Sequence, residues 1–79
     1  MRMKEFNSLE EMMPYYDKVK NLFYVEDDIK LNFDLICDWN IYAYNIKTYD
    51  NIKARDIDAW NIDAMNIKAI YLGNFTKIN

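Results

Sequence analysis

The chain of 79 residues has no histidine, one glycine, one proline and one cysteine. Without histidine it lacks the side chain that most often acts as a general base or metal ligand near neutral pH. A single glycine excludes a glycine-rich phosphate-binding loop, and Cys37 has no histidine to activate it as a nucleophile. We therefore expect a protein that is not an enzyme and binds neither a metal nor a cofactor.

The sequence also lacks long apolar runs, and we expect no secretory leader. No run is long enough to cross a membrane, and the polar residues that follow Met1 are not those of a signal peptide. The lone cysteine cannot form an internal disulfide, so Cys37 is interpreted as a small packed residue. These features predict a cytoplasmic protein of one domain.

What the chain has in abundance is a five-residue repeat between residues 54 and 69. Each isoleucine follows an Asn or Asp and precedes an alanine by two places: the units are centred on Ile57, Ile62 and Ile67. A helix turns about 100° per residue, so this spacing would spread the isoleucines around it. A flat strand alternates every two residues, so every second isoleucine would face the wrong side. A solenoid that turns a corner after each unit buries all of them.

The number of units in each coil follows from longer matches. The shift that aligns Trp39 with Trp60 also aligns Ile41 with Ile62, which indicates four sides in each coil. A three-sided coil would instead place Trp39 near Ala54, and it is the second interpretation. We expect a mainly β protein: a short four-sided β-helix of about two coils with an N-terminal α-helical cap.

Residues 1–29 do not carry the repeat. The motif Ser8-x-x-Glu11 is typical of a helix start, and Pro14 ends one short helix or begins a second. We expect residues 1–29 to form a helical cap and lead-in, and residues 30–79 to form the repeat with a C-terminal tail.

The candidate binding residues are of two kinds. Corner or outward positions of the repeat hold large side chains that anchor many protein interfaces, namely Trp39, Tyr44, Trp60 and Met65. The structural alternative is that these rings only stack on a neighbour one coil away. An acidic turn, Glu26, Asp27 and Asp28, is the second candidate for partner binding. Phe75 and Ile78 are expected to cover the last coil or to pair with a second copy, which would give a homodimer.

Charge favours a protein partner over nucleic acid. Residues 30–79 contain six acidic and six basic side chains, so the repeat is neutral, and the net charge of −3 arises from residues 1–29. A duplex mimic would be acidic, and a direct nucleic-acid binder would be basic. We expect no direct nucleic-acid binding and no membrane partner.

The Asn/Asp-Ile pairs of residues 31–72 resemble the pentapeptide-repeat proteins, which form four-sided right-handed β-helices. In that family the small residue usually comes two places before the central aliphatic residue, whereas here it comes two places after. The run Trp60-Asn61-Ile62-Asp63-Ala64 is closer to a variant of small phage and prophage proteins. The resemblance implies a phage or mobile-element accessory protein in a bacterial host, which inhibits a nucleic-acid-handling machine sterically, as anti-CRISPR proteins do. The alternatives are a self-associating module that stacks end to end and a DNA-mimic inhibitor of the gyrase type.

Overall fold

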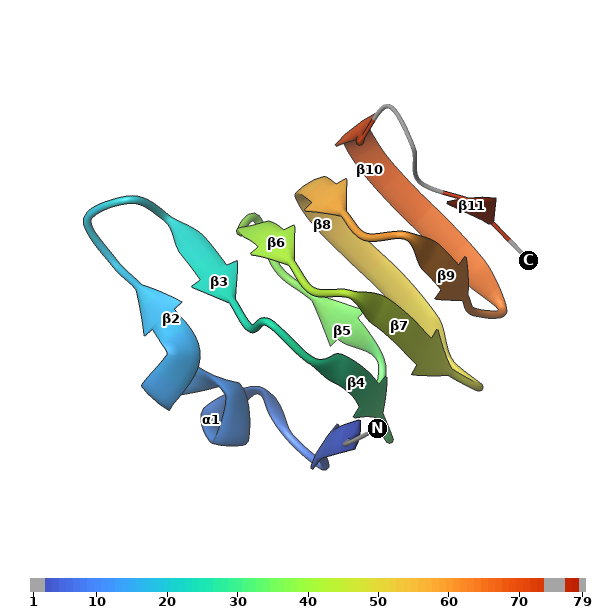
Figure 1. Ribbon diagram of the computed structural model, residues 1–79, viewed down its shortest axis with the longest axis horizontal. Helices are drawn as coiled ribbons and strands as arrows, with labels where there is room; N and C mark the ends of the chain where they lie inside the picture. The colour runs from blue at the N-terminus through green and yellow to red at the C-terminus, as the bar shows by residue number, and fades with distance from the viewer. Residues whose placement is uncertain (1–2, 74–76, 79) are drawn as a thin grey trace.

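The computed structural model describes residues 3–73 and 77–78. Short strands make up most of this part, and they lie side by side from the N-terminal end to the C-terminal end (Figure 1). In chain order the elements are β1 (Met3–Phe6), α1 (Leu9–Met12), the 3₁₀ helix η1 (Met13–Tyr15), β2 (Tyr16–Asp17), β3 (Leu22–Tyr24), β4 (Asp28–Leu31), β5 (Leu35–Ile36), β6 (Asn40–Tyr42), β7 (Asn45–Thr48), β8 (Asn51–Asp58), β9 (Asn61–Asp63), β10 (Asn66–Leu72) and β11 (Lys77–Ile78).

The strands form a parallel β-solenoid. One sheet has the order β1-β4-β7-β9-β11, and the other has the order β10-β8-β6-β3-β2, with β5 paired to β8. Every pair is parallel except β2 with β3. From β4 onward, strands that follow one another along the chain therefore belong to different sides of a coil, and each pairs with a strand of a neighbouring coil. The expected mainly β solenoid is confirmed. It has about three turns, so the expected count of about two coils is not confirmed.

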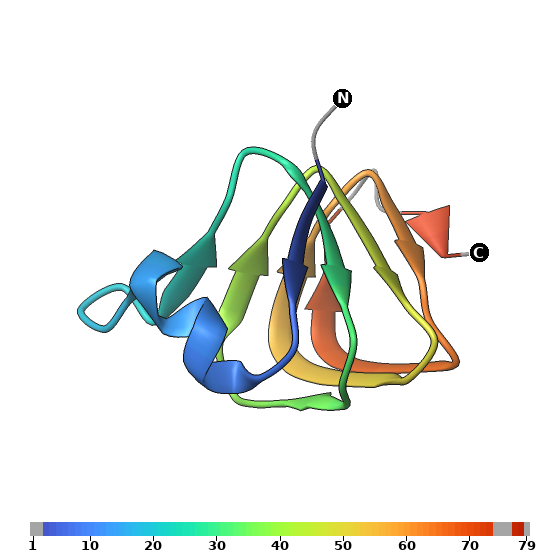
Figure 2. The same cartoon turned by 90° about the horizontal axis from the view of Figure 1, so that it is seen from below.

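The length of a turn differs from the expectation. Ile29 pairs with Ile46, and Ile46 pairs with Ile62, so a turn is shorter than the separation of Trp39 and Trp60 by about one repeat unit. The first half of β8 pairs with β5 and its second half with β6. One turn thus contains three strand segments, and the outline seen in Figure 2 is triangular. The four-sided coil, with Trp39 and Trp60 in one stack, is not confirmed.

The five-residue period alone does not distinguish a coil of three sides from a coil of four. Three five-residue units with an insertion keep the isoleucines of successive turns aligned, and four such units with an insertion do so equally well. The backbone N–H of Arg55 donates to the carbonyl of Trp39 at 2.9 Å, so Trp39 lies beside residues 54 and 55 and not beside Trp60. This is the arrangement of the three-sided alternative.

The interior follows the Ile-x-small pattern of the sequence. Isoleucines of successive turns form buried columns, such as Ile29, Ile46 and Ile62. The small residue two places later lies near a corner: Cys37 comes two places after the buried Leu35, which pairs with Ile52, so Cys37 lies in the row of Ala54. A fully buried isoleucine contributes about 1.5–3 kcal/mol. This column is therefore a main source of stability.

Asn and Asp side chains form ladders along the corners. The Nδ2 of Asn45 donates to Oδ1 of Asp28 at 2.8 Å, and the Nδ2 of Asn61 donates to Oδ1 of Asn45 at 2.9 Å. On another side, the Nδ2 of Asn66 donates to Oδ1 of Asn51 at 2.9 Å. These stacked side chains tie each turn to the next.

The N-terminal segment contributes strands as well as a helix. The helix α1 begins after Ser8, and Pro14 lies in the first turn of η1. Met12 at the end of α1 is fully buried in the core with Phe6 and Phe23. However, β1 pairs with β4 and β3 with β6, so residues before position 29 also extend both sheets. These strands lack the repeat motif, which is why the sequence did not indicate them.

Membrane crossing by a helix has no support in the described residues. None of their helices has the length and apolar character needed to span a bilayer.

Candidate functional site

Trp39 lies in the core and not on an outward corner. Its side chain is only 7% exposed. Its ring stacks on Tyr16 with centroids 4.2 Å apart and on Phe23 at 6.4 Å. The prediction of an outward Trp39 is wrong, because aromatic residues from the segment before the repeat cover this corner. Trp39 stabilises the N-terminal end of the solenoid and offers no surface to a partner.

Tyr44 and Trp60 form an exposed stacked pair. Their ring centroids are 5.3 Å apart, and the rings are inclined by 8°. The two residues occupy the same corner in successive turns, since the backbone N–H of Trp60 donates to the carbonyl of Tyr44 at 2.7 Å. Trp60 remains 63% exposed. The expected stacking of rings one turn apart is therefore present, but Trp60 stacks on Tyr44 and not on Trp39. The other face of the Trp60 ring stays open to solvent.

A second stacked pair lies beside the first. Tyr24 and Tyr42 have centroids 4.7 Å apart and an interplanar angle of 11°. Glu26 joins the pairs: one carboxylate oxygen accepts from the Tyr24 hydroxyl at 2.7 Å, and the other accepts from the Tyr44 hydroxyl at 3.3 Å. We call these four rings the aromatic corner; its members are Tyr24, Tyr42, Tyr44 and Trp60.

Sequence reasoning placed Tyr42 among the surface aromatic residues but missed Tyr24 and its stacking on Tyr42. The signal was weak, because Tyr24 lies outside the repeat and its alignment with Tyr42 follows only from the pairing of β3 with β6. The residue that joins the two pairs, Glu26, had been assigned to an acidic turn instead.

The hydrogen bonds change the titration of the hydroxyls. The bond to Glu26, supported by burial and by the charge of that carboxylate, raises the pKa of Tyr24 to about 12. The pKa of Tyr44 is also raised, first by burial and then by Glu26. Both hydroxyls therefore stay protonated at neutral pH and donate to Glu26. The corner is fixed by these bonds.

The acidic turn does not form a free anionic patch. Besides Glu26, Asp27 forms an ion pair with the Lys4 ammonium at 3.8 Å. Asp28 is buried and accepts from Asn45. The three acids face different partners, and no group of three metal-ligating side chains occurs among residues 3–73 and 77–78. Their role in this structure is to hold the first turns together.

The remaining predicted residues lie apart from the aromatic corner. Met65 is 70% exposed at the next corner of the same turn, between β9 and β10. Ile78 in β11 is 55% exposed. Phe75, which was expected to act with it, lies outside the described residues.

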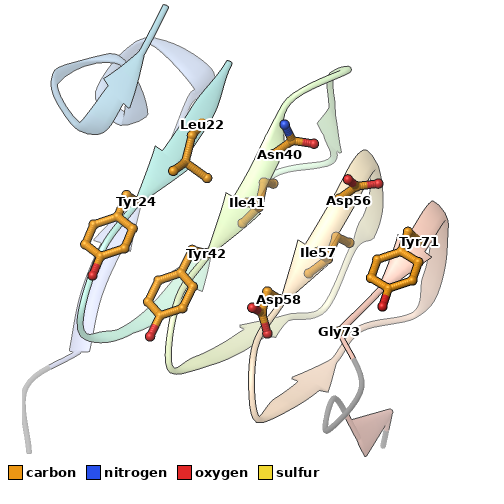
Figure 3. A pocket seen from close by; sticks show the side chains of 10 residues that line it. All are labelled: Leu22, Tyr24, Asn40, Ile41, Tyr42, Asp56, Ile57, Asp58, Tyr71 and Gly73. Carbon is orange, nitrogen blue, oxygen red and sulfur yellow. The ribbon is translucent and has the colours of Figure 1, made fainter. Parts of the chain in front are cut away.

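A groove runs along the outer face of the sheet next to the aromatic corner (Figure 3). Its volume is about 280 Å³. Figure 3 shows its polar and aromatic side chains in two rows across β3, β6, β8 and β10. The lining residues are Leu22, Tyr24, Asn40, Ile41, Tyr42, Asp56, Ile57, Asp58, Tyr71 and Gly73. Two carboxylates and no Lys or Arg belong to this set, so the groove has an acidic character.

A second groove, of about 240 Å³, is lined by Cys37 and Asp38 and by basic side chains of β8 and β10. Burial raises the pKa of the Cys37 thiol, so it remains protonated at neutral pH and is a weak nucleophile. Its position in the row of Ala54 agrees with the interpretation of a small packed residue.

No family model, curated protein or solved structure matches the chain. The function argued below therefore rests on the geometry of the site and on the sequence.

Proposed function

We propose that this protein is a non-catalytic binding module that docks on another protein through the aromatic corner. The observation that carries the proposal is the Tyr44–Trp60 stack, in which Trp60 keeps 63% of its surface open although its other face is packed. Exposed large rings on a fixed scaffold are the side chains that most often dominate the affinity of protein interfaces.

Rigidity makes this surface suited to binding. Each ring of the corner is stacked on another ring, and two of the hydroxyls are held by Glu26. A side chain that is already fixed loses little conformational entropy when a partner covers it. The strands beneath belong to a hydrogen-bonded solenoid, so we expect the corner to keep its shape when a partner binds.

The partner class is proposed from the sequence. The balanced charge of the repeat favours contact with a protein, and the resemblance to small phage proteins suggests a nucleic-acid-handling complex in the cytoplasm of a bacterial host. Inhibition would be steric, because a rigid protein bound through one corner blocks the surface it covers. This part rests on analogy.

The experiment compares proteins retained from a bacterial lysate by the immobilised full chain and by two variants. Trp60→Ser removes the open ring of the corner. The matched control is Tyr49→Ser, which removes another exposed aromatic ring, away from the corner. Circular dichroism checks that both variants remain folded. Trp39 is left intact, because its ring is part of the core.

We expect a specific protein to be retained by the wild type and by Tyr49→Ser, and lost with Trp60→Ser. Equal retention by all three chains would contradict docking through the corner. If no protein is retained and light scattering gives a mass above that of one chain, the self-associating module becomes the better explanation. Exposed Ile78 in β11 is the observation that favours that alternative.

A further inference from the structure

The second groove, of about 240 Å³, carries a net positive charge on the outer face of β5, β8 and β10. Lys53 of β8 pairs with Lys68 of β10, so these two exposed side chains neighbour each other. Arg55 adds a third cation at the corner where β8 passes from the side of β5 to the side of β6. Asp38 is the acidic residue among the described lining residues.

The repeat itself shapes this groove. Cys37, Ala54 and Ala69 form one row of small side chains across the three strands, since Leu35 pairs with Ile52 and Ala54 with Ala69. The exposed residues on both sides of this row are mostly long: the lysines precede it, and Arg55 follows it. A row of small side chains between rows of long ones leaves a hollow that crosses the strands.

The two lysines of the groove repel each other without compensation inside the molecule. Like charges on directly paired residues of adjacent strands are destabilising. Within the described part of the chain, neither Lys53 nor Lys68 forms an ion pair or lies over an aromatic ring. A second lysine pair shows the contrast: Lys30 pairs with Lys47, and both ammonium groups lie over the ring of Tyr49, at 5.9 Å and 5.6 Å. The repulsion in the groove therefore favours an anionic group from another molecule.

Exposed isoleucines beside the cations indicate that this anion belongs to a protein. Ile70 lines the groove and is 82% exposed, and Ile36, which pairs with Lys53, is 65% exposed. A surface that combines apolar side chains with cations matches a peptide that carries both apolar and acidic residues. Nucleic acid fits less well, because Asp56 and Asp58 on the adjoining side would repel a long phosphate backbone.

We propose that this groove binds an acidic segment of a protein partner, in which carboxylates alternate with apolar residues. The carboxylates accept hydrogen bonds from Lys53, Lys68 and Arg55. The apolar side chains of the segment cover Ile36 and Ile70, which otherwise remain in water.

The groove lies opposite the aromatic corner of the triangular coil. Tyr44 and Trp60 lie where the other two sides meet, between β6 and β7 and between β8 and β9. The side with the groove runs along the bottom of the triangle in Figure 2. The inference therefore goes beyond the proposed function: the protein has a second docking surface, and both surfaces can be occupied at once.

The test uses the full chain and two short peptides. The probe is acetyl-Glu-Leu-Glu-Leu-Glu-amide, and the control, acetyl-Gln-Leu-Gln-Leu-Gln-amide, keeps nearly the same shape without the charge. Nuclear magnetic resonance of the ¹⁵N-labelled protein follows the backbone amides of residues 51–54 and 66–69. We expect these signals to shift with the acidic probe, less so as sodium chloride is added, and to stay in place with the control.

Two double variants make the test specific. Lys53→Gln with Lys68→Gln removes the facing lysines of the groove, and we expect the affinity for the probe to fall about fivefold. The same variant should keep or raise the Tm, because it removes a repulsion. Lys30→Gln with Lys47→Gln removes an equal charge from β4 and β7, and we expect it to leave the affinity unchanged and to lower the Tm, because its lysines contact Tyr49.

The apolar part of the site has its own variant. Ile70→Ser should weaken binding of the leucine-containing probe about threefold. It should not affect a version of the probe in which glycine replaces leucine. Equal effects on both peptides would contradict the apolar contact.

Four results would overturn the inference: no shift with the acidic probe, equal shifts with the neutral peptide, equal losses of affinity in the two double variants, or a lower Tm after removal of Lys53 and Lys68. Equal losses would show that only net charge attracts the peptide. Tighter binding of a single-stranded thymidine oligonucleotide at the same signals would assign the groove to nucleic acid instead. The titration needs no partner from a lysate, and Trp60→Ser leaves the groove intact, so either proposal can fail without the other.

Discussion

The Asn/Asp ladder on the sheet of β4, β7 and β9 gives the sharpest test of how the turns are held together. Asn45 is its middle rung: it donates to Asp28 at 2.8 Å and accepts from Asn61 at 2.9 Å. The substitution Asn45→Ala removes both bonds. It also leaves Asp28, which is buried, without the donor from the next turn.

The expected cost follows from the two lost bonds. A hydrogen bond to a carboxylate is worth about 1.5–3 kcal/mol, and one between neutral amides is worth about 0.5–1.5 kcal/mol. Asn45→Ala should therefore lower the free energy of unfolding by roughly 2–4 kcal/mol. The free energy of unfolding of a domain of this length is on the order of 4–12 kcal/mol. The variant should therefore be measurably less stable.

The matched control is Asn66→Ala at the end of the other ladder. Asn66 donates one bond, to Asn51, and this bond is exposed. Its loss should cost about 1 kcal/mol or less. Urea unfolding followed by circular dichroism gives both values under the same conditions.

Equal losses for Asn45→Ala and Asn66→Ala, within about 0.5 kcal/mol, would refute the reasoning. That result would mean that the ladder bonds exchange with water at no net cost, and that the buried isoleucine columns alone hold the turns in register.

Two further predictions concern the aromatic residues. Glu26→Gln should lower the pKa of Tyr24 from about 12 towards 10, as measured by phenolate absorbance; an unchanged titration would exclude Glu26 as the cause. Because the folded pKa is raised, Tyr24 adds stability below about pH 10 that is lost as the pH rises towards 12. In two variants that each keep only one tryptophan, iodide should quench the fluorescence of Trp60 strongly and that of Trp39 weakly, since Trp39 is buried. Equal quenching of the two would contradict the assignment of Trp39 to the core.

Much of the fold was predictable because the repeat is local. The pairs Asn61-Ile62 and Asn66-Ile67 each place a polar side chain outside and an apolar one inside a short strand. This alternation depends only on neighbouring residues. The ladders follow as soon as like units stack in register.

The site was predictable only in part. The corner position of Trp60 could be inferred from the repeat. The ring on which it stacks could not, because the identity of that ring depends on the number of residues in a turn. Trp39 occupies an equivalent place in the sequence and is buried by Tyr16 and Phe23, which carry no repeat motif.

The sequence by itself determined that the isoleucines that directly follow Asn or Asp face inward, that Asn and Asp begin the sides of the repeat, and that the chain coils into a stack of short strands. The tertiary structure alone decided how many sides close a turn. A five-residue unit obeys the same local rules in a triangle as in a square, so the choice rests on how the inward side chains fill the space between the sides. That choice places Tyr44 beneath Trp60 and sets Asp56 against Asn40.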